Sequence, residues 1–190
     1  GKNLFYDESE SHGLSLLAKY FIGGILKYAR ETSIIMASTY NSYKAYTLER
    51  EAPISLGWGI RNRSSMIRVP YASNSSGTRI ELRSPDPSGN VYLQMAVFIA
   101  MGLQGMREKT DPGPPDEGSV YRSYDHTRIV NHDLLPRSMY EALAEADGSS
   151  FLSSILGERL YRGYLSLKIK EWEKFRTSVT TLEHSAYLSI

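Results

Sequence analysis

The sequence is most informative at residues 78–87, which read TRIELRSPDP. Apolar and charged residues alternate here, which predicts a short strand that ends before the prolines. Because successive side chains of a strand point to opposite faces, Arg79, Glu81 and Arg83 share one face. The two apolar residues between them face a core. One face of the predicted sheet therefore carries a cation, an anion and a second cation in a row.

More arginines lie just upstream, on or beside two further predicted strands, residues 54–60 and 66–69. Arg68 lies on the second of these strands, and Arg63 lies just before it. Guanidinium groups bind phosphate and carboxylate oxygens through paired hydrogen bonds, so several of them in one pocket can hold a triphosphate. A carboxylate among them can hold a divalent metal that bridges phosphates. The alternative is a surface ladder of ion pairs that each contribute little, and spacing alone does not exclude it.

A second polar cluster precedes the first strand. It comprises residues 41–44 and 49–51, NSYK and ERE, and most of it lies within residues 32–50, whose mixed composition predicts a loop. A carboxylate on a mobile loop could close a site and take a proton. The alternative is a solvated loop without a catalytic role.

The rest of the chain predicts an α+β fold, in which a few antiparallel strands are packed by helices. Helical spacing and capping residues place these helices at residues 12–30, 91–107, 137–146, 150–156 and 158–176. The helix over 91–107 is apolar on nearly every side and should be buried. Gly23 and Gly24 should weaken the first helix, unless another backbone packs close to them.

Composition removes several classes of function. Lys and Arg number 22 and Asp and Glu 21, so a net charge of +1 argues against nucleic acid as a partner. The absence of cysteine excludes disulfides and thiolate metal sites. No apolar run is long enough to span a bilayer, so we expect no membrane partner. The absence of cysteine is compatible with the cytoplasm, where we expect the protein. The four histidines are not spaced as metal ligands.

Six motifs occur in a fixed order along the chain: Asn41-Ser42-Tyr43-Lys44, Glu51-Ala52-Pro53, Arg61-Asn62-Arg63-Ser64, Ile67-Arg68-Val69-Pro70, RIELRSPDP at residues 79–87, and Asn90-Val91-Tyr92-Leu93. In order and spacing they resemble the glutamine synthetase family, and the resemblance runs from end to end of the chain. It implies that family's catalytic domain, a curved antiparallel sheet backed by helices. Residues 1–190 would be the C-terminal part of this domain, with the N-terminal β-grasp domain and the first half of the catalytic domain absent.

The resemblance also implies an activity, which is the ATP-dependent ligation of ammonia to glutamate. ATP phosphorylates the γ-carboxylate of glutamate, and ammonia then displaces phosphate from the γ-glutamyl phosphate to give glutamine. The implied cofactors are ATP and Mg²⁺ or Mn²⁺. Full-length members of the family assemble as homo-oligomeric double rings.

Matching positions imply roles for six residues. Glu51 would lie on a flap that shields the acyl phosphate and helps to deprotonate ammonium, and Arg63 would stabilise the transferring phosphoryl group. Arg63, Arg68 and Arg79 would bind ATP, Arg83 would hold the substrate carboxylate, and Glu81 would be a metal ligand. The alternation within residues 78–83 independently places Arg79, Glu81 and Arg83 on one face, as these roles require.

One residue departs from the family pattern. Members of the family usually have Lys-Arg where this chain has Lys44-Ala45, and that arginine contacts the carboxylate of the amino-acid substrate. Alanine cannot make this contact, although the nearby Arg50 could replace it. The departure leaves open a relative that makes γ-glutamyl amides from a larger amine. A non-catalytic copy of the fold is a third reading, against which the intact arginines and glutamates argue.

The chain also begins after the segments that carry the family's other metal ligands. Glu81 is the one metal ligand that the resemblance leaves in this sequence. Mg²⁺ needs several oxygen ligands in octahedral array, so one carboxylate cannot hold it tightly. We therefore expect this polypeptide alone to have no ligase activity.

Overall fold

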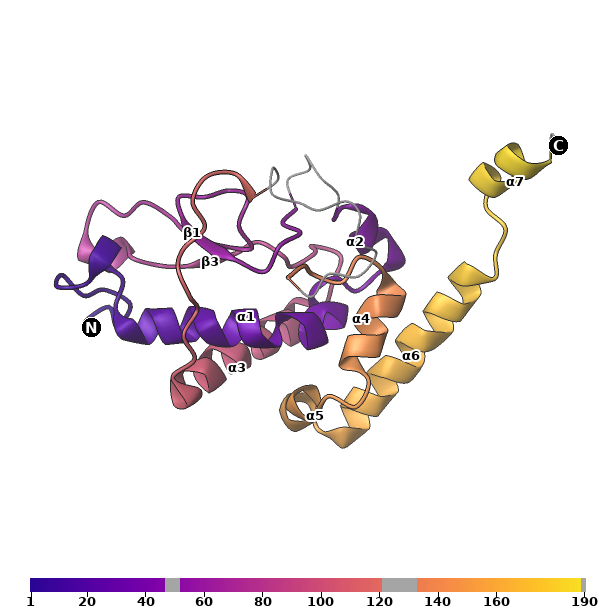
Figure 1. Ribbon diagram of the computed structural model, residues 1–190. Coiled ribbons are helices and arrows are strands. Elements are labelled where there is room, and N and C mark those ends of the chain that lie inside the picture. Colours follow the sequence, from indigo (N-terminus) through magenta and orange to yellow (C-terminus); the bar gives the residue numbers. More distant parts are fainter. Residues whose placement is uncertain (47–51, 121–132, 189–190) are drawn as a thin grey trace.

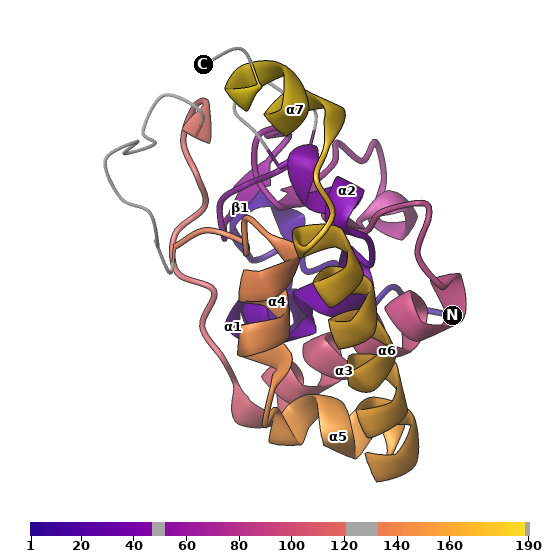
Figure 2. The same ribbon diagram turned by 90° about the vertical axis from the view of Figure 1, so that its right-hand side faces the viewer.

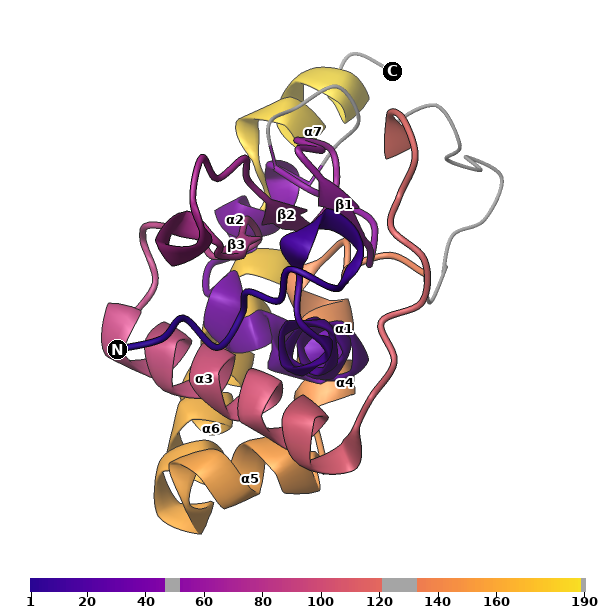
Figure 3. The same ribbon diagram turned by 90° about the vertical axis from the view of Figure 1, so that its left-hand side faces the viewer.

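A computed structural model describes residues 1–46, 52–120 and 133–188 (Figure 1; Figure 2 and Figure 3 show its two sides). The fold is α+β, as predicted, with a small sheet and helices on one side of it. The helices are α1 Leu16–Met36, α2 Tyr40–Lys44, α3 Val91–Glu108, α4 Met139–Ala146, α5 Ser150–Leu156, α6 Glu158–Arg176 and α7 Thr181–Tyr187. Short 3₁₀ turns occur at Ser11–Gly13 and Ser75–Gly77.

The longest helix, α1, forms the centre of the molecule. Its N-terminus is capped by Ser15, whose side chain accepts a hydrogen bond from the backbone amide of Ala18. The helix continues to Met36, beyond the predicted end at residue 30, so the predicted loop over 32–50 is wrong in its first part. The reason is that Ile34, Ile35 and Met36 are buried, and this packing outweighs the polar residues around them.

A second correction concerns the short helix α2, which also lies in the predicted loop. Thr39 and Ser42 form a capping box, in which each side chain accepts a hydrogen bond from the backbone amide of the other. Tyr43 anchors this helix because its ring is buried in the core.

Helix α1 lies between the sheet and α3 (Figure 1 and Figure 3). The two helices approach closely at Gly24, and the chain just after α3 packs on Gly23, so the close backbone named as the exception for this pair is present. A Cβ atom added at Gly24 would lie 2.2 Å from the carbonyl oxygen of Met101, and one added at Gly105 would lie 2.3 Å from that of Tyr20. The glycines therefore permit a backbone contact that any side chain would block.

The sheet has three short strands, β1 Trp58–Ile60, β2 Ile67–Val69 and β3 Glu81–Leu82, in the order β1-β2-β3. Strands β2 and β3 are antiparallel, as predicted, but β1 and β2 are parallel, so the sheet is mixed. Parallel strands usually need a connection of a dozen or more residues. Here residues 61–66 suffice, because β1 is about 10 Å long and the chain has little distance to return.

The remaining helices pack on the other end of α1 and beyond it (Figure 2). Buried residues of α4 and the inner face of α6, with Tyr161 and Leu165, join the same hydrophobic core. Helix α7 is exposed along its length and lies beyond the end of α6 (Figure 1). In the part of the chain that the structure describes, no helix is both long enough and apolar enough to cross a membrane.

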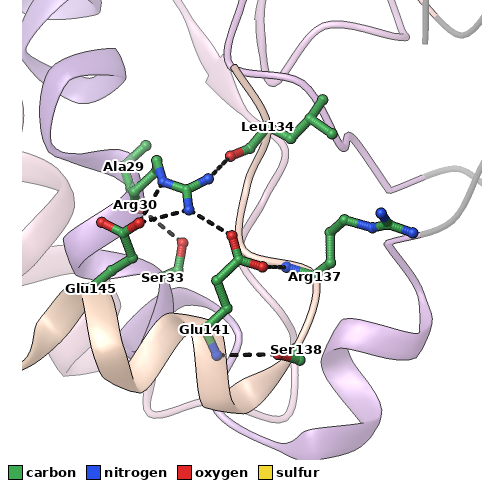
Figure 4. A network of polar contacts seen from close by, with 8 residues as sticks. All are labelled: Ala29, Arg30, Ser33, Leu134, Arg137, Ser138, Glu141 and Glu145. Carbon is green, nitrogen blue, oxygen red and sulfur yellow. Dashed lines mark hydrogen bonds and ion pairs between the residues drawn. The ribbon is translucent and has the colours of Figure 1, made fainter. Parts of the chain in front are cut away.

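A buried arginine joins α1 to α4 (Figure 4). The guanidinium of Arg30 donates to Glu141 Oε1 at 2.6 Å, to Glu145 Oε1 at 2.6 and 2.9 Å, and to the carbonyl oxygen of Leu134. Burial opposes the charge on Arg30, but the two carboxylates outweigh it and raise its pKa above the ordinary value. The backbone at Leu134 in turn pairs with Ser55, just before β1. Arg30 therefore links α1 both to α4 and to the segment at Leu134 that pairs with the chain before β1.

Candidate functional site

Three of the charged residues predicted for the site, Arg68, Glu81 and Arg83, meet at β2 and β3. Arg68 and Glu81 are directly opposite each other in the antiparallel register, and Arg68 Nη1 donates to Glu81 Oε2 at 3.1 Å. Arg83 Nε lies 3.6 Å from the other carboxylate oxygen of Glu81. One carboxylate therefore lies between two guanidinium groups, one from each strand.

The apolar residues of the same stretch face the other way. Ile80 and Leu82 pack against the hydrophobic core, and the backbone amide of Arg83 donates to the carbonyl oxygen of Met66. The strand predicted over residues 78–83 is therefore shorter than expected, since β3 covers only Glu81–Leu82, but the alternation holds from Ile80 to Arg83.

Arg68 has an unusual environment for a cation. Its Nε atom is buried and has no hydrogen-bond partner among the described residues. A buried N–H group without a partner costs free energy, so native proteins rarely keep one without a reason. An oxyanion bound beside Arg68 would supply the missing acceptor.

The two other arginines of the predicted site lie nearer to solvent. Arg79 precedes β3, is exposed, and donates to the carbonyl oxygen of Gly77 at 3.1 Å. Arg63 is exposed in the connection between β1 and β2, and its guanidinium forms no hydrogen bond or ion pair with the rest of the described chain. The structure thus brings together Arg68, Glu81 and Arg83, and leaves Arg63 and Arg79 outside their contacts.

Glu51, the predicted flap residue, lies outside the described residues. The chain is well fixed on both sides of it. Before it, Tyr46 is buried and donates its hydroxyl to the carbonyl oxygen of Ser84 at 2.8 Å. After it, the amide of Leu56 donates to Asp133 and that of Leu135 to Ile54, both at 2.8 Å.

Ala45, the position that departs from the family pattern, follows the last residue of α2 and is exposed. Its neighbour Lys44 is directed toward aromatic rings, with Nζ 5.4 Å from the centre of Phe175 and 5.8 Å from that of Tyr40. These rings are stacked 4.2 Å apart. Cation–π attraction therefore fixes Lys44 on the end of α6.

The described residues meet the requirements of a divalent metal only in part. Glu81 could be one ligand, because its carboxylate is partly exposed and lies in the sheet face. Within residues 1–46, 52–120 and 133–188, no group of three or more His, Asp or Glu residues could hold a metal ion. Both oxygens of Glu81 also face arginines. The metal would need further ligands from beyond this part of the chain.

Sequence reasoning missed one neighbouring feature. Arg61 has a positive φ of 54°, and its guanidinium lies 4.5 Å from the ring centre of Tyr71. The pair lines a hollow of about 310 Å³, with Tyr6, Asn74 and Thr78 also in its wall. The sequence shows a third arginine in this region but no signal for its backbone conformation, which depends on the tight return from β1 to β2.

The family model for the catalytic domain of glutamine synthetase matches residues 1–187. The chain belongs to the glutamine synthetase family. The glutamine synthetase of Methanosarcina mazei is 41% identical over 191 residues, which are 100% of this chain and 42% of the relative. That of Thermotoga maritima is 39% identical over 188 residues, 98% of this chain and 43% of the relative.

Among solved structures, one described as "Apo GmaS without ligand" matches with a TM-score of 0.84 and 29% identity. The match covers 100% of this chain and 42% of that chain. This chain therefore spans less than half the length of the relatives that it matches, and it corresponds to their C-terminal part.

Proposed function

We propose that the complete protein is an ATP-dependent ligase that joins ammonia to glutamate through γ-glutamyl phosphate. In the first step the γ-carboxylate of glutamate attacks the γ-phosphorus of ATP, and ADP leaves. In the second step ammonia attacks the acyl carbon, phosphate leaves, and the extra proton passes to a base. Family membership supports this reaction class.

The observation that carries the proposal is the arrangement of Arg68, Glu81 and Arg83. Phosphoryl transfer spreads negative charge over the oxygens of the moving group, and fixed guanidinium groups stabilise that charge. Arg68 already has a buried Nε in need of an acceptor, and it is held in place by Glu81 at 3.1 Å. In this proposal the two guanidinium groups are already in place before any ligand binds, which avoids the cost of arranging them during the reaction.

In this proposal each residue acts on a defined group. Arg68 and Arg79 bind ATP phosphates, and Arg63 meets the phosphoryl group as it moves. Arg83 holds the substrate carboxylate. Glu51 excludes water from the acyl phosphate and accepts a proton from ammonium.

Glu81 would hold Mg²⁺ or Mn²⁺ together with ligands from outside the described residues. When bound, the metal would neutralise phosphate charge and orient the phosphates. In the free chain Glu81 instead orients Arg68 and Arg83 by ion pairing. A homo-oligomeric assembly, as in the family, is part of the same proposal.

A second candidate is a γ-glutamyl amide ligase that uses a larger amine. Two observations favour it. Ala45 replaces the usual arginine at an exposed position beside the segment that carries Glu51. One solved relative that matches all of this chain is described as GmaS.

The test measures phosphate release by the complete gene product with ATP and glutamate, with ammonia or methylamine as the second substrate. Release that needs ammonia supports glutamine synthesis, and release that needs methylamine supports the alternative. The 190-residue chain should be inactive with both, because Glu81 is the one metal ligand that the family resemblance assigns to it and Mg²⁺ needs several. No amine-dependent release by the complete protein would reject both reactions.

Ala45→Arg sharpens this choice. If the lost arginine contact limits glutamate binding, the variant should lower the KM for glutamate by about tenfold, as expected for one charge-assisted hydrogen bond of about 1.4 kcal/mol. Asn41→Arg, an exposed position at the other end of α2, is the matched control. An unchanged KM would show that another group already holds the carboxylate.

A further inference from the structure

The segment that follows α3 runs back along the sheet (Figure 1). Helix α3 is buried mainly on the side of α1, not on nearly every side as predicted, and it is capped at Lys109. Residues 113–118, here called the strap, then lie along the outer edge of β1. Trp58 Nε1 donates to the carbonyl oxygen of Gly113 at 3.0 Å, and the amide of Asp116 donates to the carbonyl oxygen of Trp58 at 2.7 Å. The strap therefore covers an edge of the sheet.

The side chain of Asp116 makes the central contact of the strap. Its Oδ2 accepts a hydrogen bond of 2.7 Å from the hydroxyl of Ser65, which is fully buried. Gly57 makes room for the carboxylate, because a Cβ atom added there would lie 2.3 Å from Asp116 Oδ2. A Cβ atom added at Gly59 would lie 2.9 Å from the hydroxyl oxygen of Ser65. Two glycines at alternate positions thus leave space for one hydrogen bond between the strap and Ser65.

Asn62 ties the strap to the return loop, residues 61–66, which joins β1 to β2. Its side-chain amide donates to the carbonyl oxygen of Gly118 in the strap at 2.7 Å. Its Oδ1 accepts from both the amide and the hydroxyl of Ser64, at 3.0 and 2.7 Å. Together with the contact at Asp116, these bonds hold the residue before Arg63 and the two residues after it.

We propose that Asp116 is a positioning residue for Arg63. The inference rests on the proposed function, in which Arg63 meets the phosphoryl group as it moves. The Arg63 guanidinium forms no hydrogen bond or ion pair within the part of the chain that the structure describes, so its position depends on the return loop that carries it. Asp116 fixes that loop by accepting a hydrogen bond, and its charge is not required. A displacement of about 1 Å at a reacting group can cost about a hundredfold in rate.

The first experiment measures kcat and KM of the complete gene product. Asp116→Ala should lower kcat by about 10²-fold and leave the KM for ATP and for glutamate within about twofold, because Arg63 acts on the moving group and not on the bound substrates. Asp116→Asn keeps an oxygen that accepts from Ser65 and should retain most of kcat. Glu117→Ala, at an exposed neighbour in the strap, is the control and should change neither constant. A loss in Asp116→Asn as large as that in Asp116→Ala would overturn the proposal.

A double-mutant cycle with Arg63→Ala separates positioning from a general loss of structure. If Asp116 acts through Arg63, Asp116→Ala should lower kcat no further once Arg63 is alanine. A further loss of the same size in that background would overturn the proposal, because the strap would then support the protein without acting on Arg63.

Trypsin cleavage reports on the return loop without any reaction. Cleavage after Arg61 and Arg63 should be severalfold faster in Asp116→Ala than in the unaltered protein or in Asp116→Asn, because a loop that is no longer held opens more often. Mass spectrometry of the fragments identifies the cleaved bonds. If the unaltered protein shows no amine-dependent phosphate release, the proposed function fails, while this cleavage still decides whether Asp116 holds the loop. Equal cleavage of all three proteins would overturn the inference.

Discussion

The α1–α3 contact and the β2–β3 sheet face are built on opposite principles. At the helical contact, glycines bring two backbones together, and apolar side chains around them exclude water. At the sheet face, two strands of two or three residues hold two cations around one anion, near solvent. The first region contributes stability, while the second gathers charge that a stable fold alone does not need.

Substitutions in the two regions should therefore affect different properties of the protein. Changes at the helical contact should alter the free energy of unfolding and alter activity only through it. Changes at the sheet face should act mainly on activity, because ion pairs with the partly exposed Glu81 contribute little to stability.

Glu81→Gln should lower kcat/KM of the complete protein by about 10²–10³-fold, the loss seen when one electrostatic group of an active site is removed. The amide keeps the shape of the side chain but neither holds a metal tightly nor orients two arginines. The unfolding midpoint should change little, since the Glu81 side chain is 43% exposed. Glu173→Gln is the matched control, because Glu173 is 48% exposed and also pairs with an arginine. Equal activity of the two variants would remove Glu81 from the site.

Gly24→Ala should destabilise the protein by about 3 kcal/mol, because the new methyl group would overlap the backbone of α3 and the helices would have to separate. Denaturant unfolding of the 190-residue chain measures this. Gly163→Ala is the control, since Gly163 lies within α6 and has open space around it. It should stabilise the helix by about 0.5–1 kcal/mol. A stabilising Gly24→Ala would show that the close contact does not exist in solution.

Arg30→Met should destabilise the chain by about 2 kcal/mol, somewhat less than for a fully buried pair. The substitution leaves Glu141 and Glu145 facing each other on α4 without a cation. Arg162→Met removes an exposed pair with Glu158 and should change stability far less than Arg30→Met does. If both variants have the same free energy of unfolding, the network around Arg30 in Figure 4 contributes no more to stability than a surface ion pair does.

Much of the sheet face could be predicted from residues 78–83, because alternation fixes which side chains share a face. The parallel pairing of β1 and β2 could not, since it depends on the tight return at Arg61 and its positive φ. The glycine pair in α1 indicated a close backbone contact but not its partner, Gly105. Helix α2 was missed because a capping box and one buried tyrosine outweigh weak local propensity.

The site was predictable where the side chains lie on the strands and less so elsewhere. The contact of Arg68 with Glu81 follows from strand pairing. The position of Arg79 does not follow from it, because the regular strand begins only at Glu81. Arg30 gave no signal, since its partners on α4 are more than 100 residues away.

The smallest expected effect concerns a surface pair between α1 and α3. A hydrogen bond of 2.7 Å from Lys27, with further ones from Gln104 and Tyr28, lowers the pKa of Glu108 from 4.5 to about 2. Because the folded pKa is the lower one, this stabilisation is present above about pH 4.5 and is lost as the pH falls toward 2. Glu108 is partly exposed, so we expect at most about 1 kcal/mol.

Glu108→Gln should therefore be less stable than the unaltered chain at pH 6, and the two should converge between pH 4.5 and pH 2. Urea unfolding at pH 6, 4 and 2.5 measures the difference. In 1 M salt the difference at pH 6 should shrink, because screening weakens an exposed pair. Lys27→Met closes a double-mutant cycle that isolates the pair. A difference that stays constant with pH would mean that packing of the Glu108 side chain, and not its charge, joins the end of α3 to the middle of α1.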